Sequence, residues 1–172
     1  MANQVFETVR TLMAVREYDG RPIPDDVLRR IVDAGHLTAS AGNGQPWHFV
    51  LVKKAEDLRK IGSLVRSGPY IANASAAVIV AYEKAAGKWG FSDGSRAVQD
   101  MMAVAWADGV GSNWAGGPDG LDGVREQFGF PDTYVVMVVV PLGYPKRRII
   151  GKKKRKPFAE VVSLERFGTP LK

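Results

Sequence analysis

Small and polar side chains are packed together in one short stretch, "TASAGNGQPWHFVLV", at residues 38–52. Ser40, Asn43 and Gln45 supply hydrogen-bond donors and acceptors without bulk, and the glycines between them let the backbone approach a ligand closely. A simple connection needs only one or two turn-forming residues. The stretch therefore suggests the wall of a binding site for something flat or charged. An irregular helix-to-strand connection is the alternative.

Positive charge is concentrated in a second stretch, "KRRIIGKKKRK", at residues 146–156. It holds eight of the 24 basic residues and no acidic one, so the other 16 basic residues face 18 acidic residues and the net charge of +6 arises here. Lys153 and Arg155 alternate, so in an extended segment both point the same way, and two such cations can clamp a phosphate. A solvated charged loop is the alternative.

Two further features could contact a ligand. Arg16 follows the first predicted helix, where it can face an anion or simply complement the helix C-terminus. The Gly-rich stretch "ADGVGSNWAGG" at residues 107–117 contains Trp114, Gly116 and Gly117. Such a bend can direct free N–H groups at a ligand, or it can be a tight turn that needs small residues.

Helices and apolar strands that alternate along the chain must position these residues. Periodic apolar residues predict helices over 4–14, from an N-cap at Asp25 or Asp26 to near Gly35, over 55–65 and over 95–109, where Gly109 ends the helix. Apolar runs predict strands over 47–52, 76–82 and 133–143, with a short helix and an extended end in the tail, 157–172. The uninterrupted run 76–82 is expected to be central.

These elements predict a single α+β domain, 1–172, whose sheet is covered on both faces. The length of 172 residues suits one domain, and 45% hydrophobic residues is ordinary for a soluble protein. The first ten residues lack the apolar run of a signal peptide and no stretch is long enough for a membrane span, so a cytoplasmic location is expected.

The composition excludes several kinds of site. There is no cysteine, which excludes disulfides, thiolate catalysis and zinc–thiolate centres. His36 and His48 are the only histidines, so a multi-histidine metal site is not expected and no metal is predicted. A nucleic-acid-binding protein is a distant alternative, because the basic stretch has no aromatic residues among its cations.

Several motifs follow one another over roughly residues 4–168: R-x-Y with a proline-rich turn, S-A-G-N-x-Q-P-W, D-x-x-x-A-V-Q-x-M-x-x-A, G-x-G-x-x-W-x-G, F-x-x-P, L-G-Y-P and K-x-R-K-P-F-x-E-V-V. Taken together, they resemble the nitroreductase family of FMN-dependent oxidoreductases. The resemblance is to a short form of the family. It implies a nitroreductase-like fold, with a central, mostly antiparallel sheet covered by helices, and a homodimer that binds flavin at its interface.

The resemblance also implies roles for individual residues. Arg16 matches the basic residue near N1 and O2 of the flavin, Gly116 and Gly117 match the backbone near N5, and Lys153 and Arg155 match the pair that holds the FMN phosphate. The loop residues match a wall supplied by the partner subunit. The expected cofactor-binding set is Arg10, Ala14, Arg16, Ser40, Asn43, Gln45, Trp114, Gly116, Gly117, Lys153 and Arg155.

The implied activity is hydride transfer from NAD(P)H through flavin N5 to an electron-poor acceptor of the nitroaromatic or quinone type. The flavin carries the chemistry, so no catalytic residue is expected beyond the supporting Arg16. Asp93 and Tyr70 are near-site candidates, and His48 is interpreted as structural.

One position departs from the family pattern. Met13 stands where an Arg usually helps to hold the phosphate, and Arg10, one turn earlier, is the expected substitute. This departure leaves open a same-fold protein that binds a deazaflavin or modifies a flavin. Short helices are also expected to leave the strands partly uncovered in a single chain, which would make the homodimer obligate.

Overall fold

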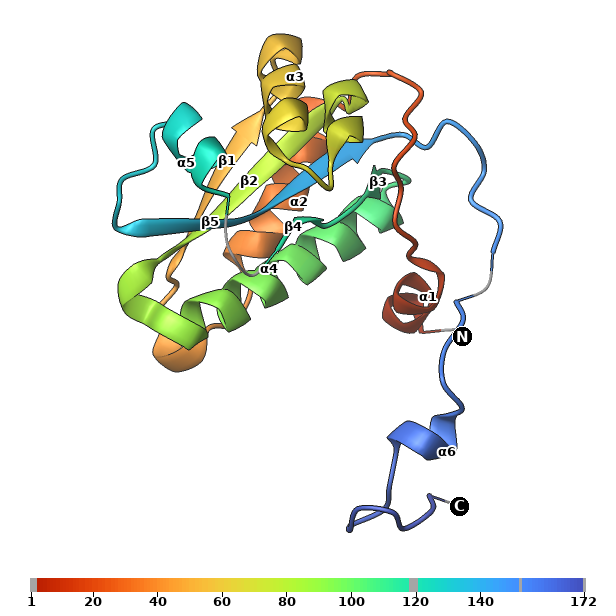
Figure 1. Cartoon of the computed structure of the whole chain (residues 1–172). Helices are drawn as coiled ribbons and strands as arrows, with labels where there is room; N and C mark the ends of the chain where they lie inside the picture. Colours follow the sequence, from red (N-terminus) through yellow and green to blue (C-terminus); the bar gives the residue numbers. More distant parts are fainter. Residues whose placement is uncertain (1–2, 118–120, 152, 172) are drawn as a thin grey trace.

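The fold is a five-stranded antiparallel sheet between two layers of helices, seen in a computed structural model that describes residues 3–117, 121–151 and 153–171 (Figure 1). The strands are β1 (Trp47–Val52), β2 (Ala76–Glu83), β3 (Gly111–Ser112), β4 (Ala115–Gly116) and β5 (Tyr134–Gly143). Their order is β1-β2-β5-β3, and β4 also pairs with β5. The predicted strand over 47–52 is confirmed, and the predicted central position of β2 is confirmed as well.

The helices are α1 (Gln4–Thr11), α2 (Asp25–His36), α3 (Ala55–Leu64), α4 (Gly87–Ala107), α5 (Asp122–Gln127) and α6 (Phe158–Val161). Short 3-10 turns lie at Ala41–Asn43, Pro69–Asn73 and Lys84–Ala86. Within the described part of the chain, no helix combines the length and the apolar character needed to cross a bilayer.

Alternate residues of β2 and β5 feed two separate hydrophobic clusters. Val78 and Val80 of β2 pack with α2 and α4, whereas Ile79 of β2 packs with α3 and α5 on the opposite face. The period-2 alternation of a strand produces this division. The prediction of a sheet covered on both faces is therefore confirmed. β2 and most of β5 are buried by helices of the same chain, so the expectation that one chain leaves the strands partly uncovered is wrong for these two. It holds for β1, in which only Val52 is buried.

The longest helix, α4, begins eight residues earlier than predicted, at Gly87 instead of residue 95. This first part of the helix contains Gly87, Gly90 and Gly94, and glycine is a poor helix former, so the local sequence does not favour a helix there. The structure shows what two of them do. A Cβ at Gly90 would lie 2.3 Å from Cδ2 of Tyr82, and one at Gly94 would lie 2.6 Å from Sδ of Met137. Their missing side chains therefore let α4 pack closely on the sheet.

Other predicted boundaries need smaller corrections. The first helix ends at Thr11, not at residue 14, and the N-cap of α2 is Pro24, with Asp25 and Asp26 inside its first turn. The Gly-rich bend contains two short strands, β3 and β4, because Ala115 and Gly116 pair with the edge of β5. Each of these short strands has only two residues, which is too short for a sequence pattern to reveal.

The segment after α1 lies antiparallel to the segment after β5. Tyr18 bridges to Pro145, the Lys146 N–H donates to the Glu17 carbonyl at 3.0 Å, and farther along Lys153 Nζ donates to the Val9 carbonyl. The basic stretch is thereby held beside α1. Beyond it, α6 and the rest of the tail extend away from the body of the domain (Figure 1).

Candidate functional site

A groove of about 550 Å³ lies between α1 and the basic stretch. Its lining residues are Phe6, Val9, Arg10, Thr11, Met13, Trp106, Ile149, Gly151, Lys153 and Arg155. The Trp106 Nε1–H donates to Thr11 Oγ1 at 3.0 Å, which fastens α1 to the C-terminal end of α4. Three of the predicted site residues, Arg10, Lys153 and Arg155, therefore meet in one groove, although 146–151 and 153–156, the described residues of the basic stretch, form no regular strand.

The groove is electropositive. None of its described lining residues is acidic. The nearest carboxylate partner is Glu7, which accepts from Arg10 Nε at 3.0 and 3.1 Å on the exposed surface. This hydrogen bond lowers the pKa of the Glu7 carboxyl and raises that of Arg10. Glu7 neutralises the charge of Arg10. The groove's remaining cations are Lys153 and Arg155, and neither faces a carboxylate among the described residues. The donor set suits a small dianion such as a phosphate.

Arg16 lies in the next stretch of chain, beside β3. Val15 N–H donates to the Ser112 carbonyl at 2.9 Å, and the Arg16 guanidinium carbon is 6.0 Å from the centre of the Tyr70 ring. Tyr70 in turn accepts a hydrogen bond from the side chain of Asn113, which is buried. Sequence reasoning did not single out Asn113. Its only signal was a polar residue within the Gly-rich stretch.

The Gly-rich stretch continues from Asn113 to Gly117. Trp114 is half-buried and meets Phe91 of α4 edge-to-face, with ring centroids 6.4 Å apart. A Cβ at Gly116 would lie 2.7 Å from the Met137 carbonyl oxygen, so strand packing alone requires a glycine there. Among the described residues, a Cβ at Gly117 would meet no atom within 4 Å. The described part of the chain therefore leaves space beside Gly117 that a ligand could occupy.

The polar loop at residues 40–45 is rigidly built. Ser40 Oγ accepts from the Gln45 N–H at 2.9 Å, and Gln45 Nε2 donates to the Asn43 carbonyl at 3.1 Å. Asn43 and Gln45 have φ values of 56° and 47°. The left-handed region is unfavourable for a residue such as Gln45, and strain of this kind concentrates at ligand-binding sites. Asp93, which is 1% exposed, anchors the loop by accepting from the Ala41 N–H at 3.0 Å.

The loop and α1, which lines the basic groove, lie at opposite ends of α4 (Figure 1). The loop is fastened to Asp93 and the groove to Trp106. Thirteen residues separate these two anchors, which corresponds to about 20 Å at ~1.5 Å per helical residue. The structure thus brings Arg10, Lys153 and Arg155 together but leaves Ser40, Asn43 and Gln45 far from them in the same chain.

The remaining candidates have structural contacts. Asp93 is occupied by the loop and by Arg96, so its burial is explained without a catalytic role. His48 packs edge-to-face against Phe130 and Tyr134 at 6.0 Å. Among the described residues, no group of three or more His, Asp or Glu side chains is placed to hold a metal ion.

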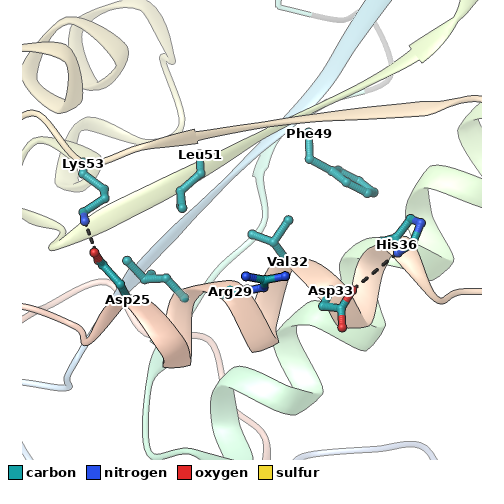
Figure 2. Close-up of a pocket in the computed structure, with 9 residues that line it drawn as sticks. Asp25, Arg29, Val32, Asp33, His36, Phe49, Leu51 and Lys53 are labelled. Carbon is teal, nitrogen blue, oxygen red and sulfur yellow. Dashed lines mark hydrogen bonds and ion pairs between the residues drawn. The ribbon is translucent and has the colours of Figure 1, made fainter.

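A second groove, of about 420 Å³, lies between α2 and β1 and contains none of the predicted site residues (Figure 2). Phe49, Leu51 and Val32 point into it, and the Lys53–Asp25 ion pair stands at one end. At the other end His36 Nδ1 is 3.4 Å from Asp33 Oδ1. Each polar group in these two pairs has a partner, and Arg29 also lines the groove beside its apolar floor.

The chain is similar to known proteins along most of its length. A sequence model of the Nitroreductase family matches residues 9–85 and 68–144. A protein of Archaeoglobus fulgidus assigned as an NADH dehydrogenase/NAD(P)H nitroreductase is 35% identical over 150 residues, which are 83% of this chain and 86% of the relative. One of Methanothermobacter thermautotrophicus with the same assignment is 34% identical over 148 residues, 82% of this chain and 77% of the relative.

Solved structures agree in fold. A crystal structure from Parabacteroides distasonis, also assigned as an NADH dehydrogenase/NAD(P)H nitroreductase, superposes with a TM-score of 0.87 at 25% identity and covers 96% of this chain and 100% of its own. An FMN-dependent nitroreductase from Clostridium difficile superposes with the same TM-score, 0.87, at 20% identity, and covers 94% of this chain and 99% of its own.

Proposed function

The chain belongs to the nitroreductase family of oxidoreductases, and we propose that it is an FMN-dependent enzyme that reduces electron-poor acceptors, of the nitroaromatic or quinone type, at the expense of NAD(P)H. One observation carries the FMN assignment. Lys153 and Arg155 lie in the same groove, beside the apolar side chains of Met13 and Trp106 and without an acidic lining residue among those described. A cationic end beside an apolar wall suits a ligand with one phosphate and a flat ring.

The residues present fit FMN in distinct ways. Lys153 and Arg155 would hold the phosphate, with Arg10 in support where the family pattern has an Arg at the position of Met13. Gly117 would leave room for the ring beside the backbone. When bound, FMN supplies the hydride-accepting and hydride-donating chemistry, while the protein supplies orientation and electrostatics.

Arg16 would act electrostatically on the reaction. Its guanidinium is exposed and lies beside Tyr70, and among the described residues no carboxylate is within ion-pair distance of it. Its guanidinium carries a positive charge, so it can stabilise negative charge that develops on a ligand next to it. Such stabilisation grows as charge develops, so it lowers a barrier more than it strengthens binding.

A homodimer would complete the site. The loop at residues 40–45 is too far from the groove of its own chain, so we propose that it faces the groove of a partner subunit. Exposed apolar residues support a second chain. Val5 and Phe6 of α1 are 74% and 61% exposed, and Phe158 and Phe167 of the tail are 65% and 105% exposed. These four large apolar side chains, two on α1 and two in the tail, would be buried if a second chain covered them.

The visible spectrum of the purified protein tests the cofactor. We expect the absorption bands of oxidised flavin, release of FMN on denaturation, and bleaching of the bands on anaerobic addition of NAD(P)H. A colourless protein that fails to take up added FMN would contradict the proposal. Uptake of a deazaflavin in place of FMN would instead favour the alternative that Met13 leaves open.

Subunit complementation tests the composite site. One chain would carry Lys153→Ala and Arg155→Ala, and the other Asn43→Ala and Gln45→Ala. If each site uses both chains, random reassociation of the two inactive proteins should restore about a quarter of the native flavin sites, because half of the dimers are mixed and each mixed dimer has one intact site. No recovery after mixing, with mixed dimers shown to form, would contradict a site shared between subunits.

A further inference from the structure

A second group of cations lies beside the phosphate groove. A hollow of about 340 Å³ is lined by Ala14, Val15, Arg16, Glu17, Arg147, Arg148, Ile149 and Ile150. Ile149 lines both cavities, so the hollow adjoins the groove that holds Lys153 and Arg155. The hollow thus brings Arg147 and Arg148, which the FMN assignment does not use, next to Arg16.

These three arginines are poorly neutralised. Glu17 is the one acidic residue among the described lining residues, and its Oε2 is 3.9 Å from Arg147 Nε. Both side chains of that pair are largely exposed, 82% for Arg147 and 67% for Glu17, so the pair is weak. Among the described residues, Arg16 and Arg148 have no carboxylate within ion-pair distance. The hollow therefore carries a surplus of positive charge.

FMN does not account for Arg147 and Arg148, since it has a single phosphate, the neighbouring groove already offers it Lys153 and Arg155, and Arg16 is assigned to the flavin ring. A guanidinium presents a planar fork of donors that matches phosphate oxygens, which a solvated lysine does not. We infer that Arg147 and Arg148 bind a phosphate of the dinucleotide that donates hydride, an inference that rests on the proposed function. The phosphate belongs either to the 2′ position, which NADPH alone carries, or to the pyrophosphate that NADH and NADPH share.

The test compares Arg147→Ala/Arg148→Ala with a matched control, Arg59→Ala/Arg66→Ala. The control also removes two exposed arginines, but these lie in and just after α3, outside both cavities. Calorimetric titration of the FMN-loaded proteins would use adenosine 2′,5′-bisphosphate as the probe for the 2′-phosphate and ADP as the probe for the pyrophosphate. We expect the Arg147/Arg148 variant to bind at least one probe about tenfold more weakly, a loss equivalent to ~1.4 kcal/mol, and the control to bind both as the wild type does.

The pattern of losses identifies the source of the phosphate. Weaker binding of the 2′,5′-bisphosphate alone, with a raised KM for NADPH and an unchanged KM for NADH, assigns the hollow to the 2′-phosphate. Weaker binding of both probes, with both KM values raised, assigns it to the pyrophosphate. Wild-type affinity for both probes overturns the inference. So does an equal loss in the control, which would reflect net charge and not a site.

Two further outcomes separate this inference from the proposed function. A variant that loses FMN affinity but keeps its affinity for both probes would place the hollow in the flavin site and overturn the inference. If the wild-type protein takes up FMN and is bleached by NAD(P)H, the proposed function stands whatever the arginines do. If it takes up no flavin, the proposed function itself fails.

Discussion

Replacement of Lys153 and Arg155 by alanine should weaken FMN binding by about 2–4 kcal/mol. Hydrogen bonds to charged groups contribute ~1.5–3 kcal/mol each, and contributions from neighbouring groups do not simply add. Two features of the structure limit the loss. Lys153 Nζ already donates to the Val9 carbonyl, and Arg155 Nη1 donates to the Lys154 carbonyl at 2.9 Å, so each cation would have to redirect a donor toward the phosphate.

The assay is an equilibrium titration of apoprotein with FMN, followed by the quenching of flavin fluorescence. Both cations are at least partly exposed, and the Debye length falls from ~10 Å at 0.1 M salt to ~3 Å at 1 M. The wild type should therefore lose affinity as salt is raised, and the double variant should lose much less. The matched control is Arg59→Ala/Lys60→Ala on α3, which removes one Arg and one Lys far from the groove.

Unchanged FMN affinity in the double variant would refute the phosphate clamp. An equal loss in the α3 control would also refute it, because the effect would then come from the net charge of the protein. Circular dichroism of both variants should match the wild type, since neither cation supports the hydrophobic clusters.

Three other changes should have measurable effects. Met13→Arg, in the wall of the groove, should tighten FMN binding by about 1–2 kcal/mol because it adds a cation near the phosphate; weaker binding would indicate a site built for another ligand. Gly94→Ala should lower the free energy of unfolding by about 1–2 kcal/mol, measured by urea denaturation, because the clash with Met137 outweighs the better helix propensity of alanine; a gain in stability would mean that Met137 moves freely. Burial raises the pKa of Tyr18, nearby Tyr70 raises it further and Arg16 opposes the rise. Above pH ~10 the Tyr ionises in the unfolded chain but not in the folded one, so the free energy of unfolding of the wild type should fall by up to ~1.4 kcal/mol per pH unit. Tyr18→Phe should cost about 1 kcal/mol at pH 7 through the lost 2.9 Å bond to the Val15 carbonyl and should remove part of this alkaline loss; a parallel decline of both proteins would exclude Tyr18 as its cause.

Local patterns in the sequence were sufficient for the main elements of the sheet and for the grouping of the basic residues. The strand over 47–52 and the central strand β2 both follow from apolar runs. Full burial explains the run in β2, because a strand covered on both faces needs an apolar residue at almost every position, whereas β1 lies at the edge of the sheet and is only partly buried. The cluster of cations after β5 is equally plain, since no acidic residue interrupts it. The motifs together indicated the family, and those of residues 40–52 and 140–162 were the most specific.

The tertiary structure decided what depends on residues distant in sequence. The early start of α4 could not be predicted because glycine disfavours a helix locally, and only the approach of Tyr82 and Met137 shows why Gly90 and Gly94 are there. The two-residue strands β3 and β4 exist because β5 offers them a free edge.

The same holds for the candidate site. Each predicted residue type was visible in the sequence, but its neighbours were not, because they are supplied by other elements of the fold. The antiparallel run of the segments after α1 and β5 places Arg10 with Lys153 and Arg155, and Arg16 with Arg147 and Arg148. The stretch of α4 between Asp93 and Trp106 separates the polar loop from the groove that holds Lys153 and Arg155 by about 20 Å at ~1.5 Å per residue. Sequence therefore determined which chemical groups are present, and the packing of the chain determined which of them can act on one ligand.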